Sequence, residues 1–134
     1  MITTVFIIDD NPTDCFIAEK LIKLTHKQSR VATFQNPLQA LEQLQTLAKT
    51  TPTDFPHLIF LDINMPIMDG WAFLEQYQTL STELIRQCSL FMLSSSSAAH
   101  DVDKAKTYAP IKAYFSKPFT MDIIDQAFEN PVSV

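Results

Sequence analysis

The sequence contains a single glycine, Gly70, among 134 residues. One glycine cannot supply the GxGxxG or GxxxxGK[ST] loops that cradle nucleotide phosphates, so both kinds of nucleotide-binding loop are excluded. Cysteine is almost as scarce: Cys15 and Cys88 lie far apart and have neither a CxxC nor a Cys/His ligand spacing. We therefore expect buried free thiols rather than a disulfide or a zinc framework.

Basic residues and long apolar runs are also in short supply. Lys and Arg number 10 against 15 Asp and Glu, a formal net charge of −5 without a basic stripe, so we expect no nucleic-acid partner. The start, MITTVFIIDD, has no basic lead and reaches two acids after a short apolar run, which is neither a signal peptide nor a membrane span. No other apolar run approaches spanning length. We expect no membrane association and a cytoplasmic location.

The rest of the composition is typical of a globular domain. Apolar residues make up 46% and charged residues 19% of a chain that is long enough to bury a sizeable core. No internal repeat or linker divides it. Residues 1–134 are therefore expected to form one domain.

Short apolar runs alternate with longer helical segments along the chain. Continuous apolar runs suit strands that are buried on both faces of a parallel sheet, and weaker runs suit its edges. The strong candidates are Val5–Ile8, Leu58–Leu61 and Leu90–Leu93, and the weaker ones are Val31–Phe34 and Ile111–Phe115.

Helix starts are visible between these strands. Asn11-Pro12 and Asn36-Pro37 each place a capping side chain before a proline that suits the first helical position. A third helix is expected after Asp69-Gly70, with a turn in which the glycine has a positive φ. A fourth is expected over Ala98 to Tyr108, then a short last helix, and the stretch TTPTDFP (50–56) is predicted to be a loop. Apolar residues at helical spacing are Phe16, Ile17, Leu21 and Leu24 in the first helix; Leu38, Leu41, Leu44 and Ala48 in the second; Trp71, Leu74 and Tyr77 in the third; and Met121, Ile124 and Phe128 in the last.

This alternation predicts an α/β protein of the (βα)₅ type. Its expected form is an open, doubly wound, parallel five-stranded sheet with helices on both faces, because the crossovers are right-handed. In such sheets ligands bind at the carboxyl ends of the strands, where the strand order reverses.

Polar side chains follow four of the predicted strands. Asp9 and Asp10 follow the first strand, Asp62 the third and Ser94 the fourth, and Lys117 comes shortly after the fifth. Each has a plain explanation when taken alone: helix-start or turn acids, a serine in a flexible SSSS loop, and a solvated lysine. Because four elements deliver such groups to one edge, the sequence predicts a site there.

Three neighbouring carboxylates limit the chemistry of this predicted site. They repel one another, so at least one has a raised pKa unless a cation compensates. An all-oxygen cluster suits a hard ion such as Mg²⁺. Zinc is disfavoured because His26, His57 and His100 fall outside the cluster, at the surface or in loops.

A Mg²⁺ site with a lysine and a hydroxyl nearby is suited to bind a phosphoryl group. Because glycine-rich cradles are excluded, that group must be small or borne by a protein. A carboxylate can itself accept it and form an acyl phosphate. Asp62, central at the predicted edge, is the candidate nucleophile.

Four motifs, IIDDNP, FLDINMPIMDGW, FMLSSS and AYFSKPF, occur in this order along the chain. Together they make nearly the whole chain resemble the receiver domain of two-component response regulators. It looks most similar to the single-domain, chemotaxis-type form. The resemblance implies the flavodoxin-like fold with strand order 2-1-3-4-5.

The resemblance also assigns roles at the acidic site. It implies that Asp62 is the phosphoacceptor. It further implies that Asp10, Asp62 and the backbone carbonyl of Asn64 ligate Mg²⁺ (or Mn²⁺), while Asp9 acts mostly through water.

Further roles follow from the resemblance for the fourth and fifth strands. Ser94 stands where the family has threonine or serine, and Lys117 stands at its invariant lysine, with a cis peptide expected before Pro118. Tyr114 matches the aromatic switch position; the alternative is a partly exposed tyrosine on an edge strand. The interval from Ser94 to Lys117 is slightly longer than in the chemotaxis form, so Ser95 remains an alternative phosphate-contacting hydroxyl.

A second departure from the family concerns the stretch KTYAPIKAY, which turns with Pro110 where relatives usually have a glycine. This difference leaves open the outline of the signalling face around the fourth helix and fifth strand. It does not affect the acidic site.

The expected function is that of a stand-alone response regulator. A sensor histidine kinase or phosphotransfer protein would phosphorylate Asp62, slow autodephosphorylation would follow, and the protein would signal by binding an unidentified downstream protein rather than act as a turnover enzyme. Because Val134 ends the sequence soon after the last predicted helix, no output domain is expected.

Three other functions are alternatives to this one. A degenerate receiver would bind partners without being phosphorylated. A haloacid-dehalogenase-type phosphatase needs a second acid two residues after the nucleophile, where this chain has Asn64. A flavodoxin-like flavin carrier is disfavoured because Asp9-Asp10-Asn11 would repel a phosphate held after the first strand.

Overall fold

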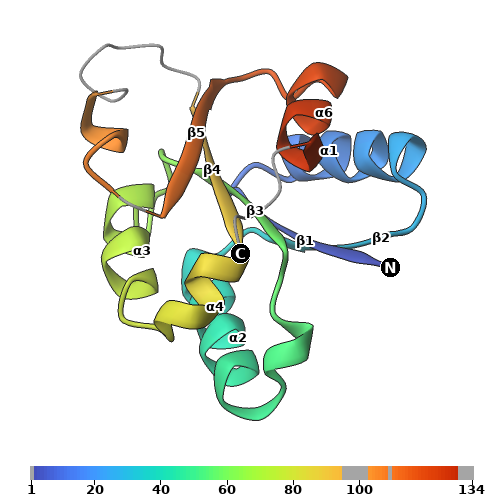
Figure 1. Cartoon of the computed structure of the whole chain (residues 1–134). Helices are drawn as coiled ribbons and strands as arrows, with labels where there is room; N and C mark the ends of the chain where they lie inside the picture. The colour runs from blue at the N-terminus through green and yellow to red at the C-terminus, as the bar shows by residue number, and fades with distance from the viewer. Residues whose placement is uncertain (1, 95–102, 109, 130–134) are drawn as a thin grey trace.

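The computed structural model describes residues 2–94, 103–108 and 110–129, which fold around a five-stranded parallel sheet (Figure 1). The strand order is β2-β1-β3-β4-β5. The predicted doubly wound α/β fold and its strand order are thereby confirmed. The strands are β1 (Thr3–Ile8), β2 (Ser29–Phe34), β3 (Leu58–Asp62), β4 (Ser89–Ser94) and β5 (Ile111–Ser116).

Helices cover both faces of the sheet (Figure 1). On one face lie α1 (Pro12–Thr25) and α6 (Met121–Glu129), and on the other lie α2 (Pro37–Thr50), α3 (Gly70–Tyr77) and α4 (Thr82–Gln87). Side chains alternate along β1, so Phe6 and Ile8 pack in the core beneath α2 and α3, whereas Val5 and Ile7 pack beneath α1 and α6. Within the described ranges no helix is long and apolar enough to cross a membrane.

Two short elements were not predicted, and one predicted helix is only partly described. The 3₁₀ helix Pro52–Asp54 lies in the predicted loop after α2, and α4 lies between α3 and β4. Of the helix predicted over Ala98 to Tyr108, the part up to 102 lies outside the described residues; residues 103–105 are helical.

Both predicted asparagine caps are confirmed. The Asn11 side chain accepts hydrogen bonds from the backbone N–H groups of Thr13 and Asp14, at 2.9 and 3.1 Å. Asn36 accepts one from Leu38 N–H at 2.9 Å. Because Asn11 closely follows the end of β1, its cap holds the first turn of α1 at the carboxyl edge of the sheet.

The buried face of α1 differs from the predicted one. Phe16 and Leu24 are 61% and 70% exposed, and Ile17 is also exposed. The helix buries a cysteine, an alanine and an isoleucine instead, and these have helical spacing of their own: Cys15, Ala18 and Ile22. The small side chains of Cys15 and Ala18 let the helix lie close to the sheet. The larger apolar side chains then lie on the outward side of the helix. In the other helices the predicted stripes are largely buried, although Leu38 and Met121 are exposed.

Gly70 has a different role from the predicted one. No described residue has a positive φ, so the turn before α3 does not require the conformational freedom of glycine. A Cβ at this position would lie 2.9 Å from both the Asp62 carbonyl oxygen and the Ile63 Cα. Gly70 is therefore needed for the close approach of α3 to the end of β3, and the Asp69 side chain caps the helix by accepting from Ala72 N–H at 2.9 Å.

The segment before β5 is attached to α3 by an aromatic contact. The rings of Trp71 and Tyr108 stack with their centroids 5.5 Å apart, and the Lys104 ammonium lies 4.8 Å from the centre of the Trp71 ring. Tyr108 also donates its hydroxyl to Glu75 at 3.0 Å. Residues 103–108 are thus held against α3.

Candidate functional site

The structure brings the three predicted acids together at the carboxyl edge of the sheet. Asp9 and Asp10 directly follow β1, and Asp62 is the last residue of β3, the adjacent strand. A carboxylate oxygen from each lies within 4.8 Å of one from each of the others. Asp9 and Asp62 are buried and Asp10 is half-buried.

Asp9 is held in place through both its backbone and its side chain. Its N–H donates to the Phe34 carbonyl at 3.0 Å, which ties the end of β1 to that of β2. Its Oδ1 accepts from Asn11 N–H at 2.9 Å, and its Oδ2 accepts from Lys117 Nζ at 2.8 Å. Since both oxygens already have a protein donor, Asp9 is a less available direct metal ligand than Asp10.

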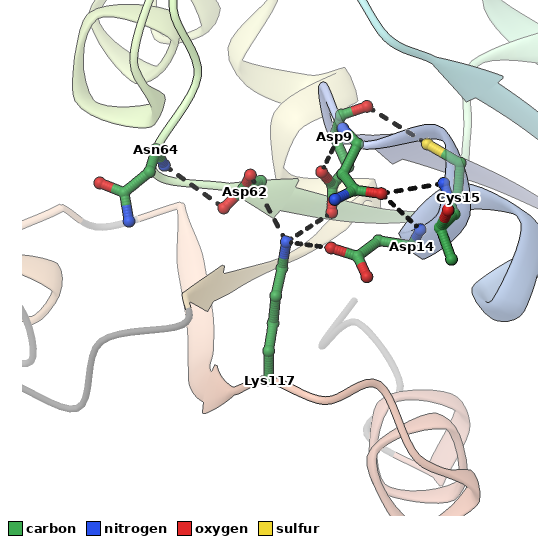
Figure 2. A network of polar contacts seen from close by, with 8 residues as sticks. Asp9, Asp14, Cys15, Asp62, Asn64 and Lys117 are labelled. Carbon is green, nitrogen blue, oxygen red and sulfur yellow. Dashed lines mark hydrogen bonds and ion pairs between the residues drawn. The ribbon is translucent and has the colours of Figure 1, made fainter.

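Lys117 directly follows β5, and its side chain points toward the carboxylates of the site (Figure 2). Its ammonium lies 2.8 Å from Asp9 Oδ2 and 3.6 Å from Asp62 Oδ2. A third carboxylate, that of Asp14, lies 2.8 Å away. Burial lowers the pKa of Lys117, but the hydrogen bonds to Asp14 and Asp9 outweigh burial and raise the pKa above its ordinary value. The lysine is therefore a fixed positive charge.

The carboxylate whose pKa this arrangement raises is that of Asp62. Burial and the Asp9 charge raise the pKa of Asp62, while Lys117 and a hydrogen bond from Asn64 N–H, at 3.3 Å to Oδ1, lower it. The net result is a pKa of about 7. One lysine does not compensate the three gathered carboxylates. As the sequence predicted, a carboxylate with a raised pKa results, and a further cation would stabilise its charged form.

The acidic cluster fits a hard divalent cation. Its donors are all carboxylate oxygens, which Mg²⁺ and Mn²⁺ prefer. The described histidines lie elsewhere: His57 Nδ1 accepts from Thr4 N–H at 3.0 Å, and the His26 ring stacks on Phe128 at 3.8 Å. Asn64 is exposed two residues beyond Asp62, where the resemblance places a carbonyl ligand.

Ser94 is the last residue of β4 and is fully buried. Its carbonyl accepts from Lys117 N–H at 2.8 Å, so the two strand ends that carry the predicted hydroxyl and ammonium are directly joined. The alternative hydroxyl, Ser95, lies outside the described residues. The peptide bond between Lys117 and Pro118 is cis, as predicted.

Tyr114 lies on β5, paired in register with Met92 of β4. It is half-buried and packs against the core beneath α2 and α3. Its role as a switch stays a prediction.

Asp14 was missed by the sequence interpretation, although it makes one of the shortest contacts of Lys117. The signal was present: the Asn11-Pro12 helix start places Asp14 in the first turn of α1, at the same edge as the strand-end acids. An acid in the first turn is common because it favours the helix dipole, so its position did not single it out.

The cysteines are buried free thiols, as predicted. Cys15 Sγ donates to the Asp9 carbonyl at 3.2 Å. Burial, with added repulsion from Asp9 and Asp14, raises the pKa of Cys15 to about 11, and burial raises that of Cys88 to about 12. Both therefore remain protonated and unreactive near neutral pH.

These features define a class: a doubly wound α/β protein with an oxygen-donor cluster, a buried strand-end carboxylate and a lysine at the carboxyl edge of its sheet. The family model of the response regulator receiver domain matches residues 5–129. The chain belongs to this family. Receiver domains interact with histidine kinases or phosphotransfer proteins and generally bind Mg²⁺ at an acidic pocket.

Solved structures agree with this assignment. A two-component response regulator from Cytophaga hutchinsonii is 25% identical, with a TM-score of 0.86 and coverage of 95% of this chain and 94% of that one. A response regulator receiver protein from Dyadobacter fermentans is 26% identical, with a TM-score of 0.82 and 96% coverage of both chains. A chemotaxis protein of Vibrio cholerae, 17% identical with a TM-score of 0.78 and coverage of 98% and 99%, shares the fold. The comparison with curated proteins found no match.

Proposed function

We propose that this receiver domain accepts a phosphoryl group on Asp62 from a phosphohistidine of a sensor histidine kinase or phosphotransfer protein. One observation carries the proposal: Asp62 ends the central strand as a buried carboxylate, 3.6 Å from the Lys117 ammonium and grouped with Asp9 and Asp10. A nucleophile that must receive an anionic group needs this combination of a fixed cation and metal ligands around it.

In the proposed reaction an Asp62 oxygen attacks the phosphorus of the donor. The O–P bond forms, the P–N bond breaks, and the imidazole nitrogen keeps the electron pair and takes a proton from solvent. Lys117 and the hydroxyl at Ser94 would donate hydrogen bonds to the phosphoryl oxygens. Water later attacks the phosphorus, the O–P bond breaks, and Asp62 is regenerated with release of inorganic phosphate. Asp62 is thus a self-catalysed acceptor in this proposal, not the nucleophile of a turnover enzyme.

The reaction is proposed to depend on Mg²⁺ or Mn²⁺. Asp10, Asp62 and the Asn64 carbonyl would hold the ion, with Asp9 acting mostly through water because both its oxygens have protein donors. Such an ion supplies positive charge to the phosphoryl oxygens. It would also lower the pKa of Asp62 from about 7, which keeps the nucleophile ionised.

We further propose that the phosphorylated form signals by binding another protein and that the protein works in the cytoplasm. The position of Tyr114 on β5, next to the strand end that carries Lys117, supports a surface that responds to the site. Two buried free thiols agree with a reducing compartment.

Incubation with acetyl phosphate and MgCl₂, followed by intact-protein mass spectrometry, tests the proposal. We expect one hydroxylamine-labile phosphoryl adduct that is absent in Asp62→Asn and without MgCl₂, and retained in Asp125→Asn, which changes an exposed acid on α6. No adduct in the wild-type chain would show a degenerate receiver. Steady-state release of p-nitrophenol from p-nitrophenyl phosphate would indicate a phosphatase instead.

Phosphotransfer profiling against the histidine kinases of the source organism would identify the donor.

A further inference from the structure

Lys117 has two close partners that differ in how easily they can be replaced. Its ammonium lies 2.8 Å from both Asp9 Oδ2 and Asp14 Oδ2, but only 5% of the Asp9 side chain is exposed against 36% of the Asp14 side chain. Asp9 is buried, and its Oδ1 also accepts a hydrogen bond from Asn11 N–H, so its side chain cannot turn to solvent. Asp14 lies on the open side of the site and can exchange the lysine for water at low cost.

The ammonium is closer to these two acids than to the phosphoacceptor. Its distance to Asp62 Oδ2 is 3.6 Å, too long for a hydrogen bond, whereas both other contacts are charge-assisted hydrogen bonds (Figure 2). The unphosphorylated protein therefore holds Lys117 on the α1 side of the site. A phosphoryl group on Asp62 adds negative charge on the other side of the ammonium, so the phosphoryl group and the Asp14 carboxylate compete for one cation.

We propose that Asp14 is a positioning residue that holds Lys117 back from Asp62 in the unphosphorylated protein and releases it when a phosphoryl group is bound. The inference rests on the proposed function and adds a regulatory role for a residue of α1. In this proposal the Asp14–Lys117 pair is stronger in the unphosphorylated state than in the phosphorylated one. By linkage, the ratio of the two pairing strengths is the factor by which Asp14 weakens binding of the phosphoryl group. Asp14 thus sets how readily the lysine engages the phosphoryl group.

The affinity for beryllofluoride, a phosphoryl analogue, tests this role. Isothermal titration calorimetry in saturating MgCl₂ gives that affinity without a kinase. We expect Asp14→Asn to bind beryllofluoride about three- to tenfold more tightly than the wild type, the range for loss of a partly exposed, charge-assisted pair. Asp122→Asn, which removes an acid from the first turn of α6, is expected to bind like the wild type.

A charge-preserving double variant, Thr13→Asp/Asp14→Thr, separates a direct contact from a general field effect. It keeps the acid in the first turn of α1 but moves it about 100° around the helix, away from Lys117. If Asp14 acts through the lysine, the double variant binds as tightly as Asp14→Asn. If it binds like the wild type, only net charge matters and the proposal is wrong.

Other outcomes are equally decisive. Unchanged or weaker binding by Asp14→Asn, with urea denaturation showing a folded protein, would mean that Asp14 only stabilises α1 or assists Lys117. Asp62-dependent binding by the wild type with no effect of Asp14 would overturn this inference and leave the proposed function intact. Absence of binding by the wild type would overturn both.

Discussion

Replacing Asp62 by asparagine is expected to stabilise the protein above neutral pH, because the native carboxylate is charged in a buried, acidic environment. Its pKa is raised from 3.8 to about 7. Between these values the folded state binds a proton that the unfolded state has lost, so wild-type stability falls as the pH rises from about 4 to about 7. Above pH 7 the full cost of the charge remains.

The size of the effect follows from the shift. About three pKa units correspond to an upper limit of about 4 kcal/mol. Because Asp62 interacts strongly with its charged neighbours and solvent screens part of this effect, we expect Asp62→Asn to gain about 1–3 kcal/mol at pH 8. The gain should fall below about 1 kcal/mol near pH 4.5, where Asp62 is protonated in the folded wild type.

Urea denaturation in EDTA, at pH 8 and pH 4.5, measures this difference without a bound cation. Asp125→Asn, the exposed acid on α6, serves as the control and should change stability little at either pH. An equal effect of Asp62→Asn at both pH values would refute the reasoning, and so would a loss of stability at pH 8. Either result would show that the Asp62 charge does not destabilise the folded protein as its raised pKa implies.

Substitutions at three further positions test the contacts around the site by urea denaturation. Gly70→Ala is expected to cost about 1–3 kcal/mol because its Cβ meets backbone atoms, and Gly70→Asn more, whereas better tolerance of asparagine would indicate a positive φ. Lys117→Met should cost about 2–4 kcal/mol in EDTA and less in MgCl₂, since a cation compensates the same carboxylates; an equal cost in both would contradict a shared site. Asn11→Ala should cost about 1 kcal/mol through loss of the α1 cap, and no loss would show that the two cap bonds contribute nothing.

The sheet and the strand-end acids were predictable from local patterns. Each buried strand is a continuous apolar run that stops at a polar residue, and parallel strands place their carboxyl ends at one edge. Asp9, Asp62 and Ser94 could therefore be assigned to one region without any knowledge of side-chain contacts. The strand order could not, because it depends on which crossovers form; it came from the family resemblance.

Features that depend on how elements pack were predicted poorly. In α1 two sets of residues have helical spacing, and only contact with the sheet decides that Ala18 and Ile22 are buried while Phe16 is exposed. The need for Gly70 arises from a close approach between α3 and β3 and not from its own backbone angles. The Asp14 contact with Lys117 joins residues 103 positions apart, which no local pattern reveals.

Trp71 is the only tryptophan in the chain, and its position gives the protein a native optical probe. The Lys104 charge lies 4.8 Å from the ring centre, and Tyr108 stacks beside it, so the indole emission depends on whether residues 103–108 stay on α3. Those residues lead into β5, which carries Tyr114 and ends beside Lys117. Fluorescence can therefore follow movement of that segment in the unlabelled protein, and phosphorylation of Asp62 can be tested for a long-range effect in the same cuvette.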